Sequence, residues 1–500
     1  MLAKKTGSED KLVMTADTES INADNAIVWN LDKTDIETYS VNVENQLQDM
    51  DINKLIEGTA EYTTRSDWTK GWKTIETLTP TDAMMIGLRD QLYTFTENDE
   101  DMPTWGQSGP YKIVDALTFD ENDKPTGVFA FDDPFWDELL NQVTLDEAIN
   151  FVANAGDDLE NLDSIQLAKV YANDGPLGYT GDQVGGYFVR WTANDKDVNP
   201  YYTPETDPLA TYRMAAMPTE PMVAATYNKE LVEREGELLG EDGLYSKESA
   251  IFAPGLNLHR TVYCARNHEY YSEDSVLMAY MGNAVCTGLQ SKGTMAEPKH
   301  FAFNAQESNR SGLSTFMTEQ AARENELRGF QMCMSNNTAQ GVMTAFNRAG
   351  TSYSGGYRSL VTNIARNEWG YMGWFVTDMI NGADYMNWRD VVGNGGGGCL
   401  TSSAYDTSDI GAMANSKSLI EKDANFQKEM KQSLKYFVYN IAQSNAMNGI
   451  SSTTEIVYVR TWVDNAILGA EICLGILTAL FLILSIRNDV LSGKKKAKEN

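Results

Sequence analysis

Alternating strand-like and helix-like segments limit the possible folds of this chain more than any other feature. Apolar strand-like segments at 251–258, 294–298, 341–346 and 374–377 are separated by helical patterns at 277–289, 319–334 and 359–369. Such alternation implies a parallel sheet with right-handed crossover connections. Over roughly 300 residues it predicts an α/β fold, a (β/α)8 TIM-like barrel. A doubly wound open sheet is the alternative, which is disfavoured because no glycine-rich phosphate turn follows these strands.

The C-terminal end carries an apolar run of 21 residues, Ala466–Ile486, whose single ionisable group is Glu471. At about 1.5 Å per residue, a helix of this length spans the hydrocarbon core of a bilayer. Trp462 precedes it by one turn, where an interfacial aromatic side chain is expected. A buried core helix is the alternative, but core helices rarely run this long without a polar interruption. The run therefore predicts one transmembrane helix.

The charge of the chain divides at this apolar run. The 71 acidic and 40 basic side chains give a net charge of −31. Residues 487–500 hold five basic and two acidic side chains, a net charge of +3, which leaves −34 for the remainder. The positive-inside rule then predicts a single-pass protein of the cell membrane, with a cytoplasmic tail and an extracellular body. Nucleic acid would repel so acidic a chain, so no nucleic-acid partner is expected.

Composition and periodicity predict five parts. Residues 1–130 are polar and weakly periodic, and we interpret them as an irregular region that packs against another part of the protein. One interpretation is that this region is the remains of a preceding domain. The other parts are a barrel domain at 131–450, a linker at 451–465, the transmembrane helix at 466–486 and the basic tail at 487–500. Residues 1–30 hold no apolar stretch like a signal peptide. We expect either a fragment of a longer gene product, which we favour, or an export signal elsewhere.

Charged side chains follow the predicted strands at the end where barrels place their chemistry. Asp378 follows one strand, Lys299 and His300 follow another, and Arg266 and Asp174 lie past two further apolar segments. An ionised carboxylate held there is a nucleophile for an anomeric carbon, and the other groups suit sugar hydroxyls. A structural cluster of salt bridges that caps the barrel explains the spacing equally well.

Motifs for other chemistries are missing from the sequence. His259 and His268 do not form a His-x-x-x-His or His-Glu-x-x-His pair, so no metal site is expected. No Gly-x-Ser-x-Gly turn is present for a serine hydrolase, and the glycine run 395–398 lacks the Lys-Ser/Thr of a phosphate loop. The five cysteines form no Cys-x-x-Cys pair. No metal or other cofactor is therefore predicted.

Several ordered motifs together carry a family resemblance over about 130–450. The run 299–310, KHFAFNAQESNR, combines a Lys-His-Phe signature with a downstream Gln-Glu and Arg. Further matching blocks lie at 174–176, 253–260, 266–274, 342–347 and 366–378. In this set of motifs the chain resembles glycoside hydrolase family 3, specifically its β-glucosidase-like branch. Its C-terminal part, with NIAQSNAMNG at 440–449, is similar to membrane-anchored bacterial members of the family. In those members the order of the two domains is swapped, so that the family's α/β sandwich domain precedes the barrel.

The resemblance implies a retaining exo-glycosidase that hydrolyses terminal, non-reducing β-D-glucosyl or related residues of oligosaccharides or other glycosides. It implies Asp378 as the nucleophile that forms a covalent glycosyl intermediate. The same resemblance implies that the substrate sugar is held by Asp174, Arg266, Lys299, His300 and Arg310.

The resemblance also implies a general acid/base, usually a Glu of the sandwich domain. About 130 residues before the barrel are too few for that domain. The alternative function is therefore a non-catalytic, membrane-tethered carbohydrate-binding subunit, or half of a split glycosidase. The expected partners are the glycoside substrate, membrane lipid around the C-terminal helix, and a separate domain or chain that bears the acid/base.

Overall fold

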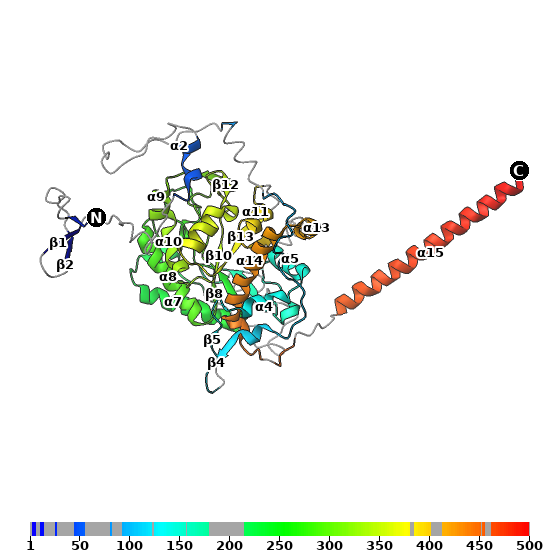
Figure 1. The fold of residues 1–500 in the computed structure, drawn as a ribbon, viewed down its shortest axis with the longest axis horizontal. Helices are drawn as coiled ribbons and strands as arrows, with labels where there is room; N and C mark the ends of the chain where they lie inside the picture. Colours follow the sequence, from blue (N-terminus) through cyan, green and yellow to red (C-terminus); the bar gives the residue numbers. More distant parts are fainter. Residues whose placement is uncertain are drawn as a thin grey trace.

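The globular part of the computed structural model is an α/β body with parallel strands at its centre and helices around them (Figure 1). The structure describes residues 45–55, 81–82, 93–122, 125–156, 158–179, 215–380, 385–401, 413–451, 453–455 and 462–499, with three short strands before residue 28. These strands, β1 (Ala3–Thr6), β2 (Lys11–Met14) and β3 (Ala26–Ile27), form an antiparallel sheet of their own. Most of 1–92 lies outside the described residues.

The central strands are parallel and lie side by side in chain order. One sheet has the order β6 (Tyr171–Asp174), β7 (Glu248–Phe252) and β8 (Met295–Ala296). The other has the order β10 (Gly341–Met343), β13 (Trp374–Ile380) and β14 (Gly398–Thr401). A parallel bridge between Phe301 and Thr344 joins the two sheets. This succession is that of a TIM-barrel-like α/β fold, as the alternation in the sequence predicts.

Two strand boundaries differ from the sequence prediction in ways that matter for the site. The apolar segment predicted as a strand over 251–258 belongs to β7 only up to Phe252, and beyond it a single parallel bridge joins Gly255 to Lys299. Pro254 has no N–H to donate to a neighbouring strand, which explains the early end. The strand predicted at 374–377 instead continues to Ile380 as β13, so Asp378 lies inside the strand.

The crossover helices follow the predicted pattern, with local departures from α geometry. The first two are α7 (Lys229–Ser246) and α8 (Ser275–Ser291), and Asp274 caps α8 by accepting from the N–H groups of Val276 and Leu277 at 2.8 and 3.2 Å. The predicted helix at 319–334 consists of α9 (Glu319–Ala321), the π-helix η8 (Ala322–Glu326) and α10 (Arg328–Ser335). The predicted helix at 359–369 is the π-helix η10 (Ser359–Glu368).

The remaining elements surround this central unit. The helices are α2 (Ile52–Leu55), α4 (Phe135–Asn141), α5 (Leu145–Ala153), α6 (Glu220–Ala224), α11 (Trp388–Gly393), α13 (Lys417–Ile420) and α14 (Ala424–Ala442). Short 3-10 turns are η1 (Gln48–Met50), η3 (Ile113–Ala116), η4 (Asp163–Ile165), η7 (Asn267–Glu269), η9 (Ser354–Gly356) and η11 (Asn445–Met447). The hairpin β4–β5 spans Leu117–Phe119 and Pro125–Val128, and β9 (Ser314–Thr315), β11 (Arg348–Ala349) and β12 (Ser352–Tyr353) form a small third sheet.

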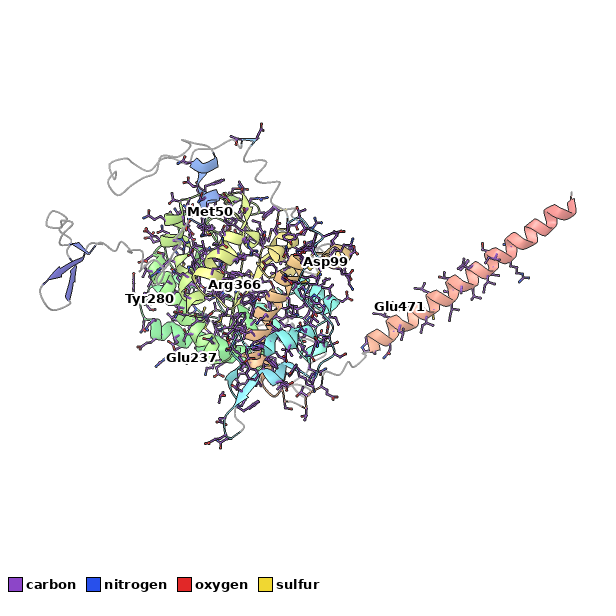
Figure 2. The ribbon with its side chains drawn as sticks, viewed as in Figure 1. Met50, Asp99, Glu237, Tyr280, Arg366 and Glu471 are labelled. Carbon is purple, nitrogen blue, oxygen red and sulfur yellow. The ribbon has the colours of Figure 1, made fainter. Side chains whose placement is uncertain are left out.

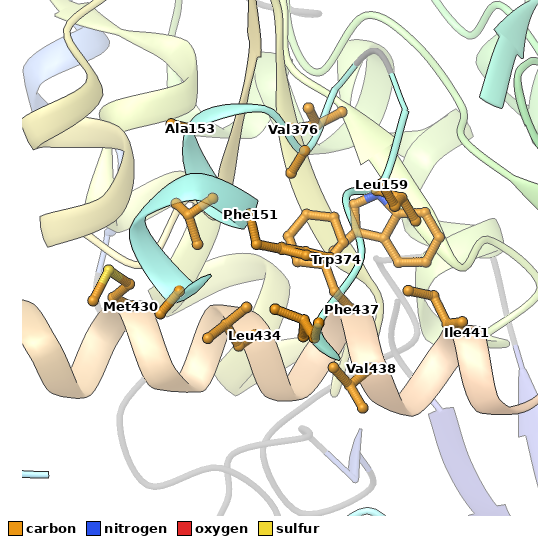
Figure 3. Packing of buried hydrophobic residues seen from close by; sticks show 14 of the residues in the cluster. Phe151, Ala153, Leu159, Trp374, Val376, Met430, Leu434, Phe437, Val438 and Ile441 are labelled. Atoms are coloured by element: carbon orange, nitrogen blue, oxygen red, sulfur yellow. The ribbon is translucent and has the colours of Figure 1, made fainter. Parts of the chain in front are cut away.

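The strand that carries Asp378 is anchored by packing against α14. Trp374, at the start of β13, is fully buried and stacks on Phe437 with ring centroids 5.2 Å apart and an interplanar angle of 20°. Phe151 of α5 meets the edge of the same Phe437 ring at 5.3 Å (Figure 3). Large aromatic side chains bury much apolar area and have few rotamers, so this contact fixes the position of β13.

A short N-terminal segment is fastened to the rim of the body around η1. Leu47 and Met50 are both fully buried, and Figure 2 labels Met50 at the edge of the body. The N–H of Leu47 donates to Oε2 of Glu319 at 2.9 Å, and the carbonyl of Met50 accepts from the N–H of Met317 at 2.8 Å. Residues 45–50 therefore belong to the folded body, although they lie more than 250 residues from the helix they contact.

Truncating Leu47 to alanine is expected to lower the free energy of unfolding by about 2–5 kcal/mol, because a fully buried leucine loses its contacts and leaves a cavity. Urea denaturation of the full chain measures the loss. The control is Gln48→Ala, at an exposed position one residue away. Equal stability of the two variants would mean that this segment does not dock on the body.

A long helix, α15 (Trp462–Glu499), forms the C-terminal end of the chain. Its stretch Asn465–Asn488 has a mean hydropathy of 2.5 and is long and apolar enough to cross a membrane. None of this stretch is buried against the body, and Figure 1 shows α15 projecting away from it. The helix extends beyond both ends of the predicted span 466–486.

Candidate active site

The C-terminal ends of β6 and β8 are joined by an ion pair. Asp174, the last residue of β6, accepts from Nζ of Lys299, three residues after β8. Lys299 is only 2% exposed, whereas the Asp174 side chain is 50% exposed. Nζ of Lys299 also lies 3.9 Å from Oε2 of Glu269. Lysine is therefore held between two carboxylates, one of which reaches solvent.

A second set of contacts continues from Glu269 to the end of β13. The other oxygen of Glu269, Oε1, accepts from Nε of Arg266, and Nη1 of Arg266 lies 2.8 Å from Nε2 of His300. Nε2 of His300 is in turn 3.6 Å from Oδ2 of Asp378. An unbroken series of polar contacts thus runs from Asp174 to Asp378, through residues that lie in or after β6, β7, β8 and β13.

These contacts fix the tautomer of His300. A guanidinium can only donate, so Nε2 accepts from Arg266, and Nδ1 carries the hydrogen and donates to the Tyr270 hydroxyl at 3.1 Å. Asn257 holds the main chain of His300 through two hydrogen bonds of 3.0 Å. Burial lowers the pKa of His300 well below its usual value, and the charges of Arg266, Lys299 and Arg310 add to this effect. His300 is therefore a neutral, fixed side chain.

Asp378 presents one carboxylate oxygen without a partner. Its N–H donates to the carbonyl of Thr344 at 3.1 Å, and its Oδ1 accepts from the N–H of Met379 at 2.7 Å. Oδ2 is buried and has no hydrogen-bond partner among the described residues. This agrees with the His300 tautomer, because the lone pair of Nε2, and not a hydrogen, faces that oxygen. Oδ2 is free to act as an acceptor or as a nucleophile.

Burial raises the pKa of Asp378 above its usual value, and neighbouring groups oppose this rise. The opposing groups are the Met379 N–H and the cations of Arg266, Arg310 and Lys299. The carboxylate is therefore poorly solvated, and positive charge compensates for this only in part.

Arg310 belongs to the same neighbourhood but contacts a different set of side chains. Its guanidinium lies 4.3 Å from the centre of the Phe346 ring, and its Nη1 donates to Glu307 at 2.9 Å. Glu307 also accepts from Asn304 at 2.9 Å. The charge of Arg310 influences the pKa values of both His300 and Asp378, so it lies near them without a direct ion pair among the described residues.

All six sequence-predicted site residues thus lie in one neighbourhood. The prediction missed the residues that hold them, namely Asn257, Glu269, Tyr270 and Glu307. The spacing gave a partial signal, since Glu269 follows Arg266 and Arg310 follows Glu307 by three residues. Within the described part of the chain, no group of three His, Cys, Asp or Glu side chains is placed to hold a metal ion.

Comparison with known proteins adds to this geometry. Residues 210–392 match the glycosyl hydrolase family 3 N-terminal domain. The thermostable β-glucosidase B of Acetivibrio thermocellus is 35% identical over 244 residues, which cover 48% of this chain and 30% of that protein. A β-glucosidase of Ruminococcus albus is 36% identical over 163 residues, 33% of this chain and 17% of that protein. The chain thus spans less than a third of the length of either relative.

A solved structure supports the fold. β-Glucosidase 3B from Thermotoga neapolitana in complex with α-D-glucose superposes with a TM-score of 0.53 at 26% identity, covering 62% of this chain and 43% of that one. The matched domain includes five of the six site residues, Asp378 among them, and only Asp174 lies outside it. With its ordered motifs, TIM-barrel-like strands and β-glucosidase relatives, the chain carries a glycosyl hydrolase family 3 N-terminal domain over residues 210–392 and is similar there to β-glucosidases.

Proposed function

We propose that this chain hydrolyses terminal, non-reducing β-D-glucosyl or related residues of glycosides, with Asp378 as the nucleophile. The observation that supports this most strongly is the buried Oδ2 of Asp378, which has no partner among the described residues and lies beside His300. The relatives are named as β-glucosidases, which favours a glucosyl substrate.

In the proposed reaction, Oδ2 of Asp378 attacks the anomeric carbon while the bond to the leaving-group oxygen breaks. That oxygen takes a proton from a general acid, and a covalent glycosyl–Asp378 ester remains. Water then attacks the same carbon, gives its proton to the conjugate base and releases the sugar with its configuration retained. Formation of the ester removes the negative charge of the Asp378 carboxylate, which is buried and poorly solvated, and this favours the step.

The remaining site residues are proposed to hold the terminal sugar. Lys299 supplies a buried cationic donor, Arg266 a partly buried one, and the half-exposed Asp174 supplies an acceptor. Charge-assisted hydrogen bonds of this kind suit a ring with several hydroxyl groups. His300 and Arg310 complete the set, with His300 orienting Arg266 through the 2.8 Å contact.

The general acid/base is proposed to come from a separate domain or chain. Glu269 and Glu307 are both engaged by arginine side chains, so neither is a free proton donor. The chain also spans a minor part of its relatives. The second candidate function is therefore a non-catalytic, membrane-tethered sugar-binding subunit, or half of a split glycosidase. We further propose that 131–450 is an extracellular barrel domain, followed by a linker at 451–465, a membrane span at 466–486 and a cytoplasmic tail at 487–500.

A β-glucoside with an activated aryl leaving group separates the two functions, since departure of such a group needs no acid. We expect the intact mass of the full chain to rise by one glycosyl group, and peptide mapping to place it on Asp378. The matched control is Asp99→Asn, at an exposed carboxylate that should not alter labelling. Sugar binding with no change in mass would favour the non-catalytic subunit.

A further inference from the structure

A cavity of about 160 Å³ lies at the end of the sheet opposite to Asp378. Met295, the first residue of β8, lines it, as do Gln340, which precedes β10, and Met372, which lies two residues before β13. The path from Met372 to Asp378 along β13 is about 20 Å at roughly 3.3 Å per residue. The cavity is therefore separate from the candidate active site.

The cavity has a neutral, amide-rich lining. Five of its lining side chains are amides, and Tyr439 and Ser444 add hydroxyl groups. The amides are Gln290, Asn337, Gln340, Asn440 and Gln443. No described residue that lines the cavity is charged. An ionic ligand would find no opposite charge here, and an apolar ligand would leave the amides without partners.

Two of these amides are deeply buried and only partly hydrogen-bonded. Gln340 is 6% exposed; its Oε1 accepts from the N–H of Ala296 at 3.0 Å, while its Nε2 makes no hydrogen bond with the described residues. Asn440 is 7% exposed; its Nδ2 donates to the carbonyls of Met372 and Tyr436 at 2.9 and 2.8 Å, while its Oδ1 has no donor among them. One free donor and one free acceptor thus line the same cavity. Neither atom is among the fully enclosed atoms that lack a partner, so both can be reached from the cavity by water or by a ligand.

From this arrangement we propose that the cavity binds one neutral sugar residue, as a second carbohydrate site distinct from the candidate active site. Each sugar hydroxyl both donates and accepts, which matches a lining that offers a free Nε2–H and a free Oδ1 together. A single water needs only about 10–15 Å³ of such volume, so the cavity holds a ligand roughly ten times larger. The half-buried ring of Tyr439 supplies an apolar face for the C–H side of the sugar.

A second site changes how the chain engages a long substrate. A disaccharide cannot reach from the cavity to Asp378 around the outside of the body, so the two sites bind different sugar units. When both units belong to one oligosaccharide or polymer, binding at the cavity raises the effective concentration of chain ends near Asp378. The site acts in retention of substrate and takes no part in bond cleavage.

Isothermal titration of the full-length Asp378→Asn chain with methyl β-D-glucoside tests the proposal, because it counts sites without turnover. We expect two sites, and Asn440→Ala is expected to weaken one of them about tenfold while the other keeps its affinity. The double variant Gln290→Ala/Gln443→Ala alters exposed rim residues and reports on the same site if Asn440→Ala fails to fold. The matched control is Gln320→Ala, at an exposed amide of α9 outside the cavity.

The proposal would be overturned if the Asp378→Asn chain with an unsubstituted cavity showed only one binding site. It would also be overturned if that chain showed two sites and neither cavity variant changed the affinity of either one. Loss of the proposed glycosidase function would have a different signature. In that case the site at Asp378 would disappear, and the site that responds to Asn440→Ala would remain. On small aryl glucosides, the cavity variants in an otherwise native chain are expected to leave turnover unchanged.

Discussion

Replacing Asp378 by asparagine is expected to abolish the release of an activated aryl leaving group from a β-glucoside, by about 10³-fold or more. Asparagine cannot form the glycosyl ester, and loss of a catalytic nucleophile commonly costs this much or more. The same change should raise the melting temperature of the protein. Burial raises the pKa of Asp378, which means that its ionised form destabilises the folded state, and asparagine carries no charge. Rates by leaving-group absorbance and unfolding by calorimetry measure the two effects.

The combination of lost activity and gained stability is what distinguishes a nucleophile from a structural carboxylate. A carboxylate that merely capped the sheet would be stabilised by its ion pairs, and its removal would destabilise the protein. Asp99→Asn, at an exposed position, should change neither property. Unaltered turnover in Asp378→Asn would rule out the assignment of the nucleophile.

The stability of the folded chain is expected to fall as the pH rises from about 5 to 8, and Glu297→Gln should remove the part of this fall that Glu297 contributes. Burial also raises the pKa of Glu235 to about 7 and that of Asp390 to about 6, and these groups act in the same direction. Glu297 is 1% exposed, and its Oε2 has no hydrogen-bond partner among the described residues. Burial raises the pKa of Glu297 from 4.5 to about 8. Between pH 4.5 and pH 8 the folded state keeps a proton on Glu297 that the unfolded state has lost. Each rise of one pH unit in this range therefore lowers the free energy of unfolding by about 1.4 kcal/mol.

Urea denaturation of the full chain at a series of pH values measures this effect. At pH 8 the glutamine variant should exceed the wild type by roughly 4–5 kcal/mol, and at pH 4 the two should be similar. His300 has the opposite sign, since its lowered pKa adds stability as the pH rises toward 6.5. The difference between the variants therefore isolates Glu297. Glu230→Gln, at an exposed position on α7, is the control, and an equal pH dependence in both variants would contradict the prediction.

Local patterns in the sequence were sufficient for the elements of the fold. The periodicity of 277–289 predicts α8, and the apolar runs at 294–298 and 374–377 predict β8 and β13. These predictions succeed because the spacing of apolar residues along the chain shows which helix face or which strand is buried. The strand boundaries were less accurate, since they depend on which N–H groups find partners in a neighbouring strand. Pro254 and the extension of β13 to Ile380 illustrate this.

Motifs in the sequence selected the candidate site residues by type, but they did not reveal the protonation or hydrogen bonding of these residues. Motifs pointed to Asp174, Lys299 and Asp378, yet the ion pair between Asp174 and Lys299 joins residues 125 positions apart. Glu269 was outside the predicted set because only the fold shows that it neutralises both Arg266 and Lys299.

The sequence by itself determined an acidic body, a succession of strands and helices, the chemical types at the strand ends and one apolar C-terminal helix. Only the tertiary structure decided that Oδ2 of Asp378 lacks a partner, that His300 is neutral with its hydrogen on Nδ1, and that a neutral amide cavity lies at the far end of the sheet. The physical reason is that hydrogen bonding and solvation depend on neighbours from distant segments, whereas periodicity and length depend on neighbours along the chain.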